Sequence, residues 1–164
     1  MIRGKVWKYG DNINTDIISP PAYMELPIKE AAKYAMSPID ENFAKEFKEG
    51  DILVAGKNLG SGSSRETAPL TLYELGVRTI VAQSFARIFY RNAVNIGILA
   101  IECPETDRIE MGDIIEINYE NGIINNLTKN EKYKCDKIPD HIMAIIKEGG
   151  LINYIVKKLQ NKSS

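Results

Sequence analysis

Three short apolar runs separated by helical segments place the strongest constraint on the fold of this chain. The runs occupy residues 51–55 (DILVA), 77–84 (VRTIVAQS) and 98–103 (ILAIEC). Between them lie two helical patterns that end in glycine, LTLYEL at 70–75 and FARIFYRNAVNIG at 85–97. Nearly continuous apolar runs are typical of strands covered on both faces. Strand–helix–strand order with short connections predicts parallel strands joined by right-handed crossovers.

The segments outside this α/β unit predict a first strand, a long loop and an antiparallel appendage. The strand pattern GKVWKYG is followed by a loop from Asp11 to Pro27 that contains three prolines. Residues 28–47 predict two helical pieces, broken before Pro38. The remaining predicted elements are a hairpin around Asn121-Gly122 within 113–127, and terminal helices at 139–150 and 151–160. We expect a single domain over residues 1–164.

Composition excludes several classes of function. The formal net charge is −1, so we expect no nucleic-acid-binding face and no polybasic membrane patch. The N-terminal segment MIRGKVWKYG lacks the apolar stretch of a signal peptide, and no apolar run approaches the length of a membrane span. The two cysteines, Cys103 and Cys135, show no metal-binding or redox spacing. These features predict a cytoplasmic protein with reduced thiols.

The turn after the first of these apolar runs is unusually rich in glycine and serine. It reads NLGSGSSRETAP from Asn58 to Pro69. Gly60 and Gly62 permit positive φ, which lets consecutive backbone N–H groups converge on one concavity, and Arg65 adds further donors. A cradle for a carboxylate or phosphate is one interpretation. An ordinary glycine-rich turn is the other, and spacing alone leaves both open.

A helix capping box is a third interpretation, because Ser63 and Glu66 have the S-x-x-E spacing. Pro69 argues against it, since a helix capped at Ser63 would place the proline where an intrahelical hydrogen bond is lost. We expect regular helix to begin near Glu66. A hydrolase nucleophile elbow and a P-loop do not fit, because no glycine stands two residues after Ser63 or Ser64 and no Gly-Lys-Ser/Thr follows. The single histidine, His141, lies on a predicted helix and is not expected to act as a base.

Three motifs, in order along the chain, resemble one family. They are DNINTDIISP at 11–20, GSGSSRE at 60–66 and SFARIFYRNAVNIG at 84–97. Together they resemble the small subunits of 3-isopropylmalate dehydratase, which are similar to the swivelling C-terminal domain of aconitase. The resemblance covers nearly the whole chain. It implies an α/β fold of three layers, β/β/α, with a mixed, barrel-like sheet and flanking helices.

The resemblance also implies a hydro-lyase that removes water from a hydroxy diacid and adds it back the other way round. Loss of hydroxide is assisted by a Lewis acid, which in this family is an iron of a [4Fe–4S] cluster. Such a cluster needs three or four thiolates, whereas this chain has two cysteines. We therefore expect no metal on this chain and a cluster on a separate large subunit. The two subunits would form a heterodimer or heterotetramer, acting in leucine biosynthesis.

Five site residues follow from matching the family motifs. Ser63 matches the residue that acts as an alkoxide base, which requires strong stabilisation of its anion. Arg65 matches the arginine that binds a substrate carboxylate, and Ser64 matches a neighbour that helps to bind substrate. Asp16 matches an aspartate that orients an arginine, and Thr15 flanks it. Without the resemblance, the NTD segment would be read as an Asx-turn.

Two arginines of the third motif have no assigned chemistry. Arg87 and Arg91 lie four residues apart, on one helix face. We expect a buried ion pair that holds the core, rather than a contact with substrate, and assign no role to Asn92. The concave edge formed by the Asp11–Pro27 loop and the turn at 60–65 is expected to face the large subunit.

The residues at the family's substrate-selecting loop are Tyr23, Met24 and Glu25, followed by Leu26. They match neither the arginine pattern of an extra carboxylate nor the aliphatic pattern of an isopropyl group. Glu25 would repel a third carboxylate if it faces the pocket, and says nothing if it faces solvent. Met24 and Leu26 can line an apolar pocket. We prefer 3-isopropylmalate; the alternatives are citramalate- or dimethylmalate-type acids, homoaconitate-type acids, and a non-catalytic anion-binding assembly module.

Overall fold

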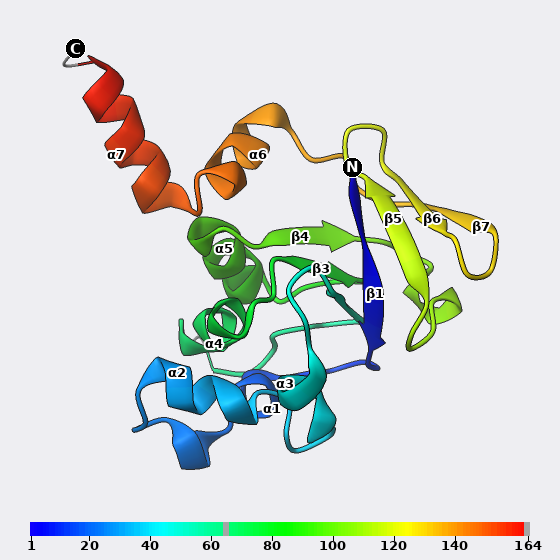
Figure 1. The fold of residues 1–164 in the computed structure, drawn as a ribbon, viewed down its shortest axis with the longest axis horizontal. Coiled ribbons are helices and arrows are strands. Elements are labelled where there is room, and N and C mark those ends of the chain that lie inside the picture. Colours follow the sequence, from blue (N-terminus) through cyan, green and yellow to red (C-terminus); the bar gives the residue numbers. More distant parts are fainter. Residues whose placement is uncertain (64–65, 163–164) are drawn as a thin grey trace.

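A computed structural model describes residues 1–63 and 66–162 of the chain. Within these residues the strands form one seven-stranded sheet in the order β4-β3-β2-β1-β5-β6-β7 (Figure 1). Their bounds are β1 Ile2–Lys8, β2 Ile52–Ala55, β3 Thr79–Ala82, β4 Leu99–Glu102, β5 Ile114–Asn118, β6 Ile123–Asn126 and β7 Glu131–Lys134. Strands β1 to β4 pair in parallel, and β5 to β7 pair antiparallel. The predicted parallel α/β unit is confirmed.

Strand β1 joins the two halves of the sheet because it changes partner along its length. Its first part pairs antiparallel with β5, with Gly4 opposite Ile115. Its second part pairs in parallel with β2, with Val6 opposite Ile52. Figure 1 shows the antiparallel half turning away from the parallel half, so that the sheet curls into a half-barrel. This confirms the mixed, barrel-like sheet.

Helices cover the parallel half of the sheet. The two that follow β2 and β3, α4 (Thr67–Leu75) and α5 (Arg87–Ile96), end at Gly76 and Gly97, both in the left-handed conformation. The shorter helices are α1 Thr15–Ile18, η1 Pro21–Tyr23, α2 Ile28–Ala31, η2 Ala32–Tyr34, α3 Asn42–Glu46 and η3 Thr106–Arg108. The last two helices are α6 Asp140–Lys147 and α7 Leu151–Lys162.

Two apolar clusters lie on opposite faces of the parallel strands. Alternation along β2 shows this, because Leu53 packs in one cluster while Ile52 and Val54 pack in the other. The first cluster lies under the helices and includes Trp7, Phe43, Phe47, Leu72 and Phe89. The second lies between the parallel strands and the antiparallel appendage, and includes Ile101, Ile117, Ile124, Tyr133 and Met143. The layers are therefore helix, parallel sheet and antiparallel sheet, as expected.

Three regions differ from the sequence predictions. The Asp11–Pro27 loop contains α1 and η1, because Asn14 Oδ1 accepts the Ile17 N–H (2.9 Å) and caps one helical turn. The break predicted before Pro38 is present, since the chain turns at Met36, whose φ is 64°; the helical pieces on either side of it are shorter than predicted. Strand β7 was not predicted, because its sequence EKYK carries one large apolar side chain, Tyr133.

Helix α7 projects from the body of the protein and carries an exposed apolar stripe (Figure 1). Ile152 and Leu159 on this stripe are 77% and 61% exposed. Ile155 and Val156 lie on the same side of the helix, and both are exposed. In the part of the chain that the structure describes, no helix is both long and apolar enough to cross a membrane.

Candidate functional site

Segments from three parts of the chain meet at the turn after β2. On one side, Thr15 donates its N–H to the Ser61 carbonyl (2.9 Å). On the other, Ala86 donates its N–H to the Leu59 carbonyl (2.9 Å), just before α5. The turn is thus held between the Asp11–Pro27 loop and the start of α5, much as a strand is held between two neighbours. The expected meeting of this loop with the turn is observed.

Gly60 and Gly62 give the turn its shape. Their φ values are +86° and +104°, in the left-handed region that L side chains rarely adopt. A Cβ on Gly60 would lie 2.2 Å from the Phe89 ring, and a Cβ on Gly62 would lie 3.2 Å from the Thr15 hydroxyl. The predicted positive φ values are therefore confirmed. The Gly60 N–H, however, does not join an anion cradle, because it donates to the Ile13 carbonyl (2.8 Å).

Ser63 is exposed at the end of this turn, beside α1. Its Oγ lies 3.3 Å from the Oγ1 of Thr15, a buried residue, and either hydroxyl can donate. Asp16, the next residue along, is exposed in the first turn of α1. The structure thus brings Ser63 to the segment that carries Thr15 and Asp16. Ser64 and Arg65, also expected at this site, lie outside the described residues.

Helix α4 begins directly after the turn, as Pro69 predicts. Its first residue is Thr67, and its N-cap, Glu66, makes no side-chain capping hydrogen bond. The S-x-x-E capping box is therefore not formed. Pro69 falls in the first turn of the helix, where a missing N–H costs no intrahelical hydrogen bond. The positive end of the α4 dipole lies next to the serine turn, which favours an anion there.

A cavity of about 190 Å³, hereafter the Ser63 cavity, opens beside this serine. The turn and Thr15 form one wall, and the first residues of α5, including Arg87 and Ile88, form the other. Arg87 was not predicted to line the site. One signal could have found it: Arg87 follows the carboxyl end of β3, where open α/β sheets bind ligands.

The prediction that Arg87 and Arg91 are buried ion-pair partners is wrong. Both side chains are exposed. Neither forms an ion pair with any residue in 1–63 or 66–162. The reason is the orientation of α5, which turns Phe89 and Ala93 into the core and leaves the side with the two guanidinium groups in solvent.

A second cavity, of about 280 Å³, lies beside the start of α4 and is hereafter the Met24 cavity. Its apolar lining includes Met24, Leu26, Ile28 and Leu70. Thr67 also lines this cavity; its hydroxyl is buried and has no hydrogen-bond partner among residues 1–63 and 66–162. The apolar side chains of the wall favour an apolar group in this cavity.

Tyr23 and Glu25, the other two residues of the predicted substrate-selecting loop, do not line the Met24 cavity. The ring of Tyr23 stacks on the ring of Tyr34, with centroids 3.7 Å apart and an interplanar angle of 5°. This contact fastens η1 to η2 and so fixes the backbone that carries Met24. Glu25 is exposed and does not line the Met24 cavity.

Neither cysteine has the properties of a metal ligand. Over residues 1–63 and 66–162, no group of three or more His, Cys, Asp or Glu side chains could hold a metal ion. Both thiols are free. Burial raises the pKa of Cys103, and burial together with the nearby Cys103 raises the pKa of Cys135 to about 12. Because the thiolate is the form that binds metals and attacks electrophiles, both side chains are chemically quiet.

We expect iodoacetamide to alkylate both cysteines at least about tenfold more slowly in the folded chain than in urea at pH 8, because the raised pKa values leave little thiolate in the folded state. Timed alkylation followed by mass spectrometry measures the two rates. Equal rates in the folded and the urea-unfolded chain would contradict the inferred protonation.

Comparison with known proteins defines the class of this fold. Residues 11–106 match the family model of the aconitase C-terminal domain. The matched segment contains the NTD loop, the serine turn and α5, so it includes every wall of the Ser63 cavity. The fold and the site therefore define a swivelling domain of the aconitase type.

Relatives that match over the full length narrow this class. The 3-isopropylmalate dehydratase small subunit of Hydrogenobaculum sp. (strain Y04AAS1) is 51% identical over 164 residues, covering 98% of this chain and 99% of the relative. Small subunit 1 of the dehydratase from Archaeoglobus fulgidus is 46% identical over 161 residues, again covering 98% and 99%. The crystal structure of 3-isopropylmalate dehydratase (leuD) from Methanocaldococcus jannaschii has a TM-score of 0.91 and 43% identity, covering 99% of both chains. The chain belongs to the family of 3-isopropylmalate dehydratase small subunits.

Proposed function

We propose that this chain is the base-supplying small subunit of a cytoplasmic hydro-lyase that interconverts 2-isopropylmalate and 3-isopropylmalate through 2-isopropylmaleate, in leucine biosynthesis. The observation that carries the proposal is the placement of Ser63. Its hydroxyl is exposed, lies 3.3 Å from Thr15 Oγ1, and opens on a cavity at the end of β2, in a chain 51% identical to a dehydratase small subunit. The proposed partner is a large subunit that holds a [4Fe–4S] cluster, in a heterodimer or heterotetramer.

The reaction needs a base for a carbon-bound proton and assistance for the departing hydroxide. We assign the base to Ser63 Oγ. Thr15 Oγ1 and the positive end of α4 would stabilise its alkoxide, and Arg65 is proposed to add its guanidinium charge. Asp16 is proposed to orient Arg65. The cluster of the large subunit would supply the Lewis acid.

The substrate has two carboxylates and an apolar branch. We assign a carboxylate to Arg65 and Ser64, since a guanidinium binds a carboxylate through two parallel hydrogen bonds. The isopropyl group is assigned to the Met24 cavity, whose wall of Met24, Leu26, Ile28 and Leu70 favours apolar groups. Tyr23 positions this loop through its stack on Tyr34. Glu25 is exposed and does not line this cavity, so its charge does not discriminate between substrates.

A substrate panel tests the proposal. Mixed with the cluster-bearing large subunit, the purified chain is expected to hydrate 2-isopropylmaleate with a kcat/KM at least about tenfold higher than that for citraconate. Citraconate lacks two of the carbons that the apolar cavity would bury, each worth about 0.8 kcal/mol. Homoaconitate is expected to be a poor substrate, because its extra carboxylate would lie against the apolar wall of the Met24 cavity.

Three results would redirect the assignment. A preference for citraconate or homoaconitate would keep the proposed hydro-lyase reaction but assign a different substrate to the enzyme. Binding of isopropylmalate without turnover would favour the non-catalytic assembly module. Turnover by this chain alone, without iron, would contradict the division of the site between two subunits.

A further inference from the structure

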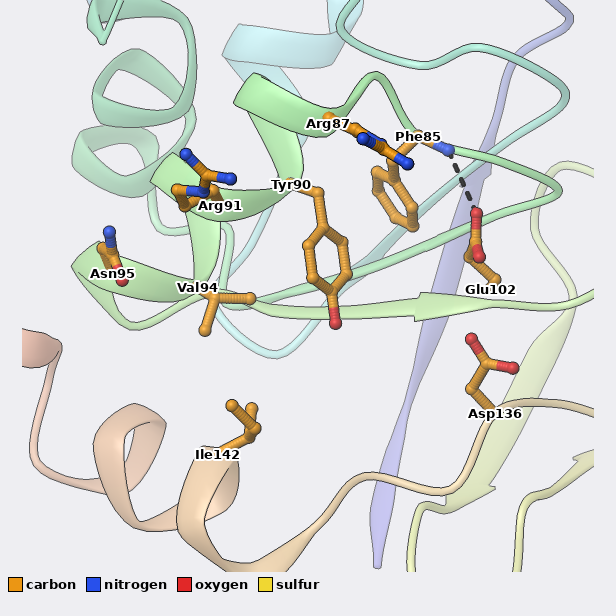
Figure 2. A pocket seen from close by; sticks show the side chains of 9 residues that line it. All are labelled: Phe85, Arg87, Tyr90, Arg91, Val94, Asn95, Glu102, Asp136 and Ile142. Carbon is orange, nitrogen blue, oxygen red and sulfur yellow. Dashed lines mark hydrogen bonds between the residues drawn. The ribbon is translucent and has the colours of Figure 1, made fainter.

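A groove of about 640 Å³ runs along the outer side of α5 and is hereafter the α5 groove (Figure 2). Arg87, Tyr90 and Arg91 come from α5 on one side. Glu102, at the end of β4, and Asp136, after β7, come from the other. Figure 2 shows Tyr90 between Arg91 and the acidic pair, Arg87 beside Phe85, and Ile142 of α6 below Tyr90.

The charges of this groove face each other across a gap and do not neutralise one another. Within the described residues, Arg87, Arg91, Glu102 and Asp136 form no ion pair. Glu102 is held in place, because its Oε2 accepts the Phe85 N–H (3.3 Å). Opposite charges held apart in a groove attract a ligand that carries both signs, with the acidic group toward the arginines.

The acidic wall also acts on the tyrosine between the two sides. Burial raises the pKa of Tyr90, and the negative charges of Asp136 and Glu102 raise it further. The phenol therefore stays protonated and can donate a hydrogen bond. A tyrosine flanked by arginines, half in contact with solvent, is the composition found at the centres of protein–protein interfaces.

The α5 groove lies next to the Ser63 cavity, because Arg87 lines both. Between them the helix presents apolar surface to solvent: Ile88 is 50% exposed and Tyr90 is 36% exposed. A protein that covers the Ser63 cavity from outside would therefore also contact the α5 groove. An occupant of this kind explains the unpaired charges and the exposed apolar side chains together.

We propose that the α5 groove is a docking surface for the large subunit. Its occupant is a segment with an acidic side chain toward Arg91, a basic side chain toward Asp136 and an apolar side chain over Tyr90 and Ile142. The inference rests on the proposed function, because that function requires a second subunit at the Ser63 cavity.

Charge reversal on each wall tests the docking surface. Arg91→Glu and Asp136→Lys are each expected to raise the Kd for the purified large subunit at least tenfold, measured by biolayer interferometry. Both positions are exposed, so the variants should keep the thermal unfolding midpoint of the wild type. The wild-type Kd should rise with ionic strength, and the rise should be smaller for Arg91→Glu.

Lys132→Glu is the matched control. It makes the same change of charge as Arg91→Glu, at an exposed position on β7 outside the groove lining. Its Kd should equal that of the wild type. A wild-type Kd for both groove variants, in a complex that is active on 2-isopropylmaleate, would overturn the docking surface and leave the proposed function intact. Failure of the wild-type chain to bind the large subunit would overturn both.

Discussion

Replacing Ser63 by alanine in the assembled enzyme is expected to lower turnover of 3-isopropylmalate by about 100- to 10,000-fold, the range associated with loss of a positioned acid–base group. The substitution removes the Ser63 Oγ, which lies 3.3 Å from Thr15 Oγ1 at the Ser63 cavity. Because Ser63 is exposed, no core packing is lost. The thermal unfolding midpoint and the Kd for the large subunit should therefore stay at wild-type values while kcat falls.

A second serine of the same turn provides the control. Ser61 contributes its backbone carbonyl, which accepts the Thr15 N–H, and alanine at this position keeps that carbonyl. Ser61→Ala should keep turnover close to wild type, whereas Ser63→Ala should not. Retention of wild-type kcat by Ser63→Ala would remove the serine from the chemistry and leave Ser64 or a group of the large subunit as the base.

Much of the fold follows from local patterns that the sequence displays directly. The buried runs at 51–55, 77–84 and 98–103 contain β2, β3 and β4, because a strand covered on both faces must be apolar along its whole length. Pro69 alone located the start of α4 to within a residue, since proline tolerates the first turn of a helix and not its interior. These signals are strong because they depend on residues close together in the chain.

The elements that escaped prediction depend on distant partners. Strand β7 is short and polar, and it exists because β6 offers an unpaired edge, with Ile124 opposite Tyr133. The helical pieces on either side of the expected break before Pro38 are shorter than predicted, because the Met36 N–H donates to the Ile17 carbonyl (3.1 Å) across the fold. A pattern within one segment carries no information about such hydrogen bonds.

For the candidate site, too, the sequence predicted some features, and others depend on tertiary packing. The motif predicted that the NTD segment and the serine turn belong together, and the structure joins them through Thr15 and Ser61. The orientation of Arg87 could not be predicted, because a spacing of four residues places Arg87 and Arg91 on one face without saying whether that face is buried. Tertiary packing of Phe89 decides it. The hydrogen bond from the Gly60 N–H to the Ile13 carbonyl likewise forms only in the folded chain.

Gly60→Ala is expected to lower the free energy of unfolding by about 3 kcal/mol or more. Two costs add: a left-handed φ of +86° for a residue with a Cβ, and an overlap in which that Cβ lies 2.2 Å from the Phe89 ring. Chemical denaturation monitored by circular dichroism measures the change. Relief of the overlap requires the turn and α5 to move apart, so the Ser63 cavity should widen and activity of the assembled enzyme should fall as well.

Gly112→Ala separates the two costs. Gly112 has nearly the same φ, +85°, but apart from its two chain neighbours no described residue has an atom within 4 Å of an added Cβ. This variant should lose only about 1–2 kcal/mol, the cost of a left-handed conformation alone, and should keep its activity. Equal losses for the two variants would mean that Phe89 yields freely to the added methyl group. In that case the contact between the turn and α5 would not fix the position of Ser63, and the serine would depend on the large subunit for its placement.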